Sequence, residues 1–221
     1  MLETVTVDRA VTADGTEFVL ARHGEEWVVR AGGRTLMSSR VHDSEEELAE
    51  AALERAPQAR SILVGGLGLG FTLRAVLDRA GPDARVTVAE LVPNLVEWNR
   101  THVAPLADYP LRDPRCEVVV GDVYELLKQS VRAFDVILLD VDNGPVALSS
   151  SGNDRLYSER GVRVCRSALR GLDGVLAVWS AGPSPRFERR LAHAGMQVEV
   201  LRVAARSGSR ARHVIFLAQA R

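Results

Sequence analysis

The chain has 221 residues, 46% of them hydrophobic, with 28 basic and 29 acidic side chains and a formal net charge of −1. This length is enough to bury one sizeable core and leaves little room for two full domains. The balanced charge gives no electrostatic reason to expect a nucleic acid partner. No stretch approaches the roughly 20 apolar residues of a membrane helix, and the first residues lack the pattern of a signal peptide. We therefore expect a cytoplasmic protein with no membrane partner.

The sequence also offers no pattern of metal ligands. Cys116 and Cys165 lie far apart, and the five histidines are scattered along the chain. Neither set has the spacing of a zinc or redox motif. We expect no metal site and two reduced thiols.

The first 43 residues are rich in short strand patterns. Apolar and aromatic runs at 18–20, 27–30 and 34–37 are separated by a charged turn and by Gly32-Gly33, which is typical of an antiparallel meander. Such a sheet is too small to fold alone. We predict an N-terminal β-meander extension over 1–43 and one main domain over 44–221.

We predict that a helix follows the meander. Ser44 with Glu47 three places later has the spacing of a capping box, which predicts a helix from Ser44 to about Arg55. In the simplest interpretation its acidic residues form a solvated face; the alternative is that they hold a cationic substrate. These residues are Glu45, Glu46, Glu47 and Glu50.

From Ser61 onward, apolar strand runs alternate with helical stretches. The strands lack polar alternation, which indicates a sheet covered on both faces and favours a parallel, doubly wound α/β arrangement of the Rossmann-like type. The turn at 206–212 leaves no room for a crossover helix, so the last two strands must pair antiparallel. The predicted strands cover residues 62–64, 86–89, 118–120, 136–139, 175–179, 198–201 and 214–217.

The first of these strands runs into a glycine-rich loop at 65–70. Glycines allow a tight turn and the close approach of a ligand beside a helix N-terminus. The next strand ends in Glu90, at the offset where a carboxylate accepts both ribose hydroxyls. The alternative is a structural turn with a surface Glu. The predicted cofactor-binding residues here are Gly65, Gly66, Gly68, Gly70, Glu90 and Leu91.

The third strand is followed by Gly121, Asp122 and Val123, which we also predict to contact the cofactor. An Asp at this strand end is well placed to bond an adenine amino group. It is equally suited to cap the next helix. The two roles are compatible.

The fourth strand is followed by Asp140-Val141-Asp142-Asn143-Gly144-Pro145. Carboxylates at the carboxyl end of a central strand lie where open α/β sheets bind ligands. Paired like charges raise the pKa of one member, which suits proton transfer. The alternative is a loop of turn-forming residues. We predict Asp142, Asp140 and Tyr157 as catalytic residues, with Asp140 also touching the cofactor; Tyr157 either reaches the acceptor or merely packs at a helix start.

The glycine loop, Glu90, Gly121-Asp122, the 140–145 run and Leu156-Tyr157 together resemble the spermidine synthase family, a branch of the class I methyltransferase-like fold. The resemblance implies a seven-stranded sheet with its last strand antiparallel, and a homodimer. It also implies that Glu90 holds ribose, that Asp122 meets adenine, and that Asp140 and Asp142 face an amine acceptor. In the family the second Asp deprotonates the attacking amine, and that role falls here on Asp142.

One departure bears on the reaction. The family's loop reads Gly-Gly-Gly-Asp-Gly-Gly, and its Asp grips the ammonium of decarboxylated S-adenosylmethionine; this chain has Leu67 and Leu69 and no Asp. A buried ammonium without an anionic partner is costly. We therefore predict S-adenosylmethionine as cofactor and methyl transfer to a small amine or similar nucleophile. The alternatives are aminopropyl transfer from the decarboxylated cofactor to a polyamine, and a catalytically silent adenosyl-binding module.

Overall fold

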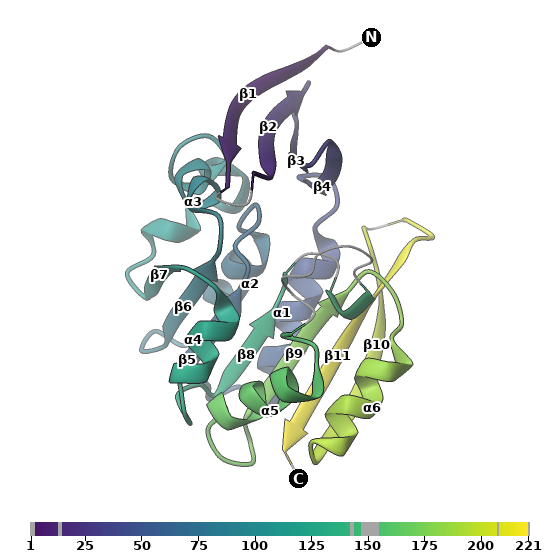
Figure 1. Cartoon of the computed structure of the whole chain (residues 1–221). Helices are drawn as coiled ribbons and strands as arrows, with labels where there is room; N and C mark the ends of the chain where they lie inside the picture. The colour runs from purple at the N-terminus through teal and green to yellow at the C-terminus, as the bar shows by residue number, and fades with distance from the viewer. Residues whose placement is uncertain (1–2, 13–14, 142–143, 147–154, 207, 221) are drawn as a thin grey trace.

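The computed structural model describes residues 3–12, 15–141, 144–146, 155–206 and 208–220. It contains a four-stranded antiparallel sheet and a seven-stranded sheet (Figure 1). The smaller sheet lies beyond the carboxyl ends of the parallel strands of the larger one.

The smaller sheet is an antiparallel meander in the order β1-β2-β3-β4. Its first strand was not among the predicted runs, because it alternates Thr with Val and contains Asp8-Arg9, so no apolar or aromatic run marks it. A residue far along the chain stabilises Asp8 in this strand: the indole N–H of Trp98 donates to Asp8 Oδ2 at 2.7 Å. The strands are β1 (Thr4–Val11), β2 (Glu17–His23), β3 (Glu26–Ala31) and β4 (Arg34–Ser38).

The seven-stranded sheet has the order β10-β11-β9-β8-β5-β6-β7. β11 runs antiparallel to both of its neighbours, and the other pairs are parallel. This confirms the predicted α/β class, the seven strands and the antiparallel last strand. The strands are β5 (Ser61–Gly65), β6 (Arg85–Glu90), β7 (Cys116–Val120), β8 (Val136–Leu139), β9 (Val175–Ser180), β10 (Met196–Ala204) and β11 (Arg212–Ala220).

Helices cover both faces of this sheet. Ile62 and Val64 pack on the layer of the first three helices, while Leu63 between them packs on the layer of the last three. The strands are therefore apolar on both sides, as the sequence indicated. One layer holds α1 (Asp43–Arg55), α2 (Phe71–Arg79) and α3 (Pro93–Arg100); the other holds α4 (Val123–Gln129), α5 (Glu159–Ala168) and α6 (Pro185–His193); the 3-10 helices are η1 (Ala104–Ala107), η2 (Pro110–Arg112) and η3 (Gly144–Val146).

The predicted capping box at Ser44 is wrong. The helix begins at Asp43, and Ser44 lies inside its first turn. The Ser44 side chain is buried; its Oγ accepts the indole N–H of Trp179 at 3.1 Å and lies 2.8 Å from Nδ1 of His213. These partners, brought together by the sheet, displace the local capping bond.

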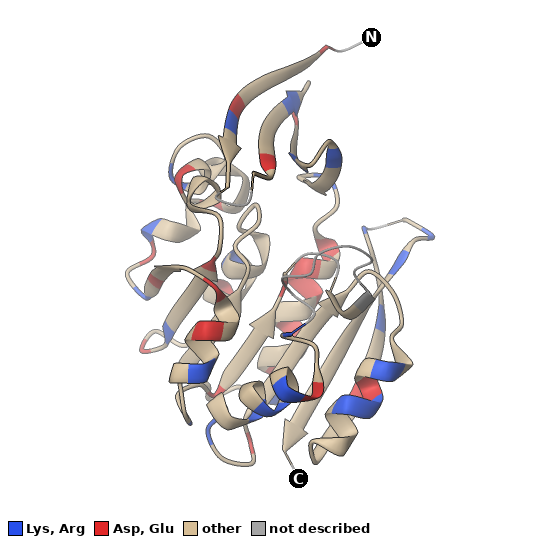
Figure 2. Ribbon diagram, in the orientation of Figure 1, with Lys and Arg blue, Asp and Glu red and all other residues tan. Residues whose placement is uncertain are grey.

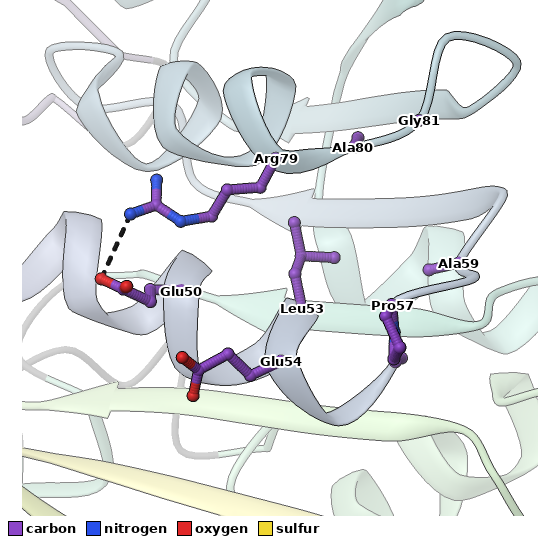
Figure 3. Close-up of a pocket in the computed structure, with 9 residues that line it drawn as sticks. Glu50, Leu53, Glu54, Pro57, Ala59, Arg79, Ala80 and Gly81 are labelled. Carbon is purple, nitrogen blue, oxygen red and sulfur yellow. Dashed lines mark hydrogen bonds and ion pairs between the residues drawn. The ribbon is translucent and has the colours of Figure 1, made fainter.

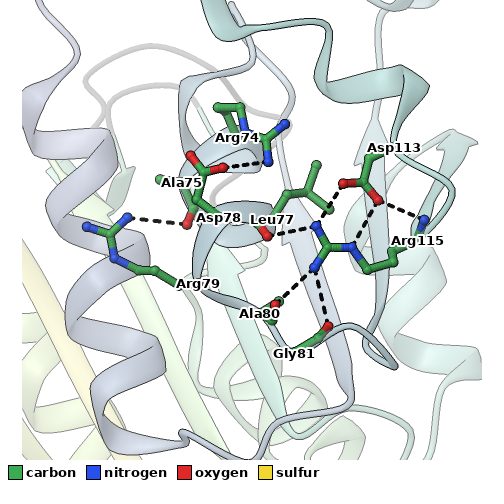
Figure 4. Close-up of polar contacts among 9 residues, drawn as sticks. All are labelled: Arg74, Ala75, Leu77, Asp78, Arg79, Ala80, Gly81, Asp113 and Arg115. Carbon is green, nitrogen blue, oxygen red and sulfur yellow. Dashed lines mark hydrogen bonds and ion pairs between the residues drawn. The ribbon is translucent and has the colours of Figure 1, made fainter.

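Arg115 fixes the far end of α2 (Figure 4). Its guanidinium donates to the carbonyl oxygens of Leu77 at 2.8 Å and of Ala80 at 2.9 Å, and its Nη2 lies 2.7 Å from Asp113 Oδ2. The side chain of Arg115 is 20% exposed. One cation thus satisfies the last carbonyls of a helix and anchors it to the start of β7.

We expect Arg115→Ala to lower the free energy of unfolding by about 2 kcal/mol, because several partly buried hydrogen bonds to a charged group are lost. Urea denaturation followed by circular dichroism measures this. The control is Arg79→Ala, which removes an exposed ion pair to Glu50 and should cost about 0.5 kcal/mol or less. Equal losses in the two variants would contradict the role given to Arg115.

Candidate active site at the carboxyl edge of the sheet

Parallel strands β8, β5, β6 and β7 lie side by side, so the loops that follow them meet at one edge. The glycine loop, Glu90, Asp122 and Asp140 each lie at or just beyond the end of one of these strands. The structure therefore brings together the described residues that the sequence assigned to one site. Asp142 lies outside the described residues.

The glycine loop approaches the β8 strand end too closely for any side chain at Gly66. Gly66 has φ +93°, and a Cβ placed on it would lie 2.1 Å from the carbonyl oxygen of Asp140. Gly68 and Gly70 also have positive φ. Asn99, which no sequence motif singled out as part of the loop, donates from Nδ2 to the carbonyl oxygen of Gly68 at 2.8 Å.

Glu90 holds this loop from the neighbouring strand. Its Oε2 accepts the N–H of Leu67 at 2.9 Å, and its Oε1 accepts the N–H of Val92 at 2.8 Å. Burial raises the pKa of Glu90, although the backbone donors oppose this. Each carboxylate oxygen keeps a second lone pair for a ligand hydroxyl. Leu91 beside it is 62% exposed and offers an apolar surface.

Asp122 caps α4, as one of the two predicted roles requires. Its Oδ1 accepts the N–H of Tyr124 at 2.7 Å, and its Oδ2 pairs with Arg155. The contact with adenine stays a prediction. Of the flanking residues, Gly121 donates its N–H to the carbonyl oxygen of Glu90 at 2.8 Å, and Val123 is buried against Gly65; their contact with the cofactor also stays a prediction.

Asp140 follows β8 directly, and its carboxylate reaches α2. Its Oδ2 accepts the hydroxyl of buried Thr72 at 2.6 Å. Burial raises the pKa of Asp140 to about 6, against the lowering effect of the Thr72 hydrogen bond. A carboxylate with this proton affinity suits proton transfer near neutral pH.

Tyr157 contacts the backbone of the segment that follows Asp140. It is buried, and its hydroxyl donates to the carbonyl oxygen of Val141 at 3.3 Å. The helix begins later than the sequence indicated: Tyr157 lies before its start, because Ser158 caps α5 and the helix begins at Glu159. The described contact makes Tyr157 a support of the loop backbone; its catalytic role stays a prediction.

Glu45 lies close enough to Asp140 for their charges to interact, although the simplest interpretation of the sequence placed it in solvent. It is half-buried, whereas Glu46 and Glu47 are exposed. Burial, and then the negative charges of Asp140 and Glu46, raise the pKa of Glu45 well above its usual range. The signal was available: Glu45 lies three and four residues before the buried Leu48 and Ala49, on the inward stripe of α1.

The described residues have three further features: a cavity, no cluster of metal ligands and no membrane-spanning helix. A cavity of about 260 Å³ opens between the end of α1 and the end of α2 (Figure 3), beside the loops that precede β5 and β6 and thus at the opposite edge of the sheet. Among the described residues no cluster of three or more His, Cys, Asp or Glu could hold a metal ion. Within the same part of the chain, no helix is long and apolar enough to cross a membrane.

Residues 42–195 match the family model described as the spermine/spermidine synthase domain. The chain belongs to the spermine/spermidine synthase family. Its curated relatives include polyamine aminopropyltransferase 1 of Hyperthermus butylicus, 31% identical over 72% of this chain and 56% of the relative. Another is polyamine aminopropyltransferase 2 of Pseudomonas aeruginosa, 33% identical over 60% of this chain and 37% of the relative. The chain thus spans just over half the length of the first relative and less than half the length of the second.

Solved spermidine synthases share the fold of this family member. The enzyme from Thermotoga maritima superposes with a TM-score of 0.78 at 19% identity, covering 97% of this chain and 72% of that one. A spermidine synthase in complex with the transition state analogue AdoDATO gives 0.77 over the same shares, also at 19% identity. The curated relatives are named for aminopropyl transfer, so the comparisons favour our alternative over methyl transfer, the reaction that we preferred from the sequence.

We expect Gly66→Ala to weaken binding of 5′-methylthioadenosine at least tenfold, because its Cβ forces the glycine loop away from the Asp140 backbone. Isothermal titration calorimetry measures the affinity. The control is Gly81→Ala, where a Cβ has nothing within 4 Å and binding should be unchanged. Wild-type affinity in Gly66→Ala would show that the loop adapts.

Proposed function

We propose that the protein transfers an aminopropyl group from decarboxylated S-adenosylmethionine to a small diamine or polyamine. One observation carries the proposal: Asp140, a half-buried carboxyl group with raised proton affinity, follows β8 with its backbone against the glycine loop, in a chain of the spermine/spermidine synthase family. Family membership supports the amine acceptor, and Asp140 supports its deprotonation.

The residues present fit an adenosyl group. Gly66 and Gly68 leave the backbone open for close approach, Glu90 retains lone pairs for ribose hydroxyls, and exposed Leu91 offers contact to a flat ring. The sulfonium of the donor supplies an activated carbon beside a good leaving group.

The protein's part is to orient the acceptor and take its proton. An amine is a cation at neutral pH and attacks only after losing a proton. We assign the proton to Asp140, whose Oδ2 is held by Thr72. The new C–N bond then forms as the C–S bond breaks, leaving 5′-methylthioadenosine. Most of the rate enhancement comes from in-line positioning. Asp142, to which the family resemblance assigns this deprotonation, lies outside the described residues, and its role as the base stays a prediction.

The test is a transfer assay with the purified full chain. We expect decarboxylated S-adenosylmethionine and 1,4-diaminobutane or spermidine to yield 5′-methylthioadenosine and an aminopropylated amine, both detected by mass spectrometry. S-adenosylmethionine with the same amines is the matched control and should yield no methylated product. Methylated amine in that control, with no aminopropyl product in the first assay, would restore methyl transfer.

The pH profile tests the role of Asp140. The carboxyl group acts as a base only when ionised, and its pKa is raised to about 6, so kcat/KM should fall as pH drops through this value. Thr72→Val removes a hydrogen bond that favours the ionised form, so the acid limb should move to higher pH. Asp140→Asn should lower kcat by about 100-fold or more while 5′-methylthioadenosine still binds. An acid limb that stays in place in Thr72→Val would remove Asp140 from this role.

A further inference from the structure

The first turn of α1 is fixed in place by residues from two distant strands. Ser44 Oγ accepts the indole N–H of Trp179 on β9 at 3.1 Å and lies 2.8 Å from Nδ1 of His213 on β11. The rings of Trp179 and His213 meet edge to face with centroids 4.6 Å apart. Burial lowers the pKa of His213, which favours its neutral form. Glu45, the next residue, is therefore held at the site by an anchored backbone.

The acidic residues of this helix differ in their partners. Glu46 Oε1 lies 2.8 Å from Nδ1 of His42, and Glu50 pairs with Arg79 at 3.1 Å. Glu47 is exposed to solvent. Glu45 has neither a hydrogen bond nor an ion pair from its side chain to any residue that the structure describes. Glu45 and Glu50 are both half-buried, but only Glu50 has a cation beside it, and the nearby charges that act on Glu45 are the negative ones of Asp140 and Glu46.

This arrangement is electrostatically incomplete. Two carboxylates that share a site and lack a cation repel each other and lose solvation. The charges that act on Glu45 are those of Asp140 and Glu46; His42 pairs with Glu46, and His213 bonds to Ser44, so no permanent cation of the described residues balances the pair. A cationic ligand placed between them would relieve both costs. Figure 2 shows this acidic end of α1 turned toward the carboxyl ends of the central strands.

We propose that Glu45 is the specificity-determining carboxylate of this site and binds a primary ammonium group of a substrate. The inference rests on the proposed function, in which both substrates carry such a group: the aminopropyl end of the donor and the ends of the acceptor. The same charge disfavours a donor that bears a carboxylate. Glu45 on α1 thus supplies an anionic partner that the glycine loop, with Leu67 and Leu69, does not supply.

The experiment compares wild type, Glu45→Gln and Glu47→Gln by isothermal titration calorimetry. The two variants remove the same charge from the same turn, and Glu47 is the exposed control. The probes are decarboxylated S-adenosylmethionine, 5′-methylthioadenosine, which shares the adenosyl part and lacks the ammonium, and 1,4-diaminobutane added to the 5′-methylthioadenosine complex.

We expect Glu45→Gln to weaken either decarboxylated S-adenosylmethionine or 1,4-diaminobutane at least tenfold, with 5′-methylthioadenosine unchanged within twofold. Loss for the first probe assigns Glu45 to the donor ammonium, and loss for the second assigns it to the acceptor. Glu47→Gln should leave all three affinities unchanged. Wild-type affinity of Glu45→Gln for both ammonium probes would overturn the proposal.

Two further readouts separate this role from others. Removing a repelled, half-buried charge should keep or raise the melting temperature of Glu45→Gln, whereas a residue needed for folding would lower it. The binding measurements do not depend on turnover. Absence of aminopropyl transfer in wild type with a lasting Glu45→Gln binding defect would refute the reaction and leave the ammonium site standing.

Discussion

The site depends on backbone hydrogen bonds that join the loops beyond the strand ends. Asp140 donates its N–H to the carbonyl oxygen of Gly65 at 2.8 Å, Gly66 to that of Ala89 at 2.9 Å, and Gly121 to that of Glu90 at 2.8 Å. These bonds continue the ladder of the sheet past its edge and lock four loops together. The close approach that they impose is the reason for the glycine at position 66.

The buried and half-buried carboxylates at the carboxyl ends of these strands differ in how many hydrogen-bond donors they have. Glu90 is satisfied by two backbone donors, and Asp140 by one hydroxyl. Glu45 has no such donor among the described residues and faces a like charge. A carboxylate held by donors keeps its place and can still accept a ligand hydroxyl, whereas one without donors costs stability unless a ligand completes it. These carboxylates therefore range from one fixed by the backbone to one that needs a cation.

Elements set by local pattern were predictable, and those set by distant partners were not. The apolar runs and the short turn at 206–212 predicted the sheet and its antiparallel last strand. Ser44 was misread because its hydroxyl bonds to His213, 169 positions away, rather than to its own helix. β1 was missed for the same reason: the hydrogen bond that Asp8 accepts from distant Trp98 is not visible in the local sequence. For Glu45, the helical periodicity indicated an inward-facing position. We nevertheless placed it in solvent, because acidic residues are usually solvated.

The preference for methyl transfer rested on the missing loop Asp, and the structure shows why that argument was incomplete. Leu67 and Leu69 are both 3% exposed; Leu67 packs with the α1–α2 layer and Leu69 with the meander and α3. The loop side chains are thus committed to packing. An ammonium is recognised by charge, which a carboxylate on any element reaching the edge can supply. Because α1 precedes β5 and runs back along the sheet, its first turn reaches that edge, and Glu45 is the side chain that it presents there.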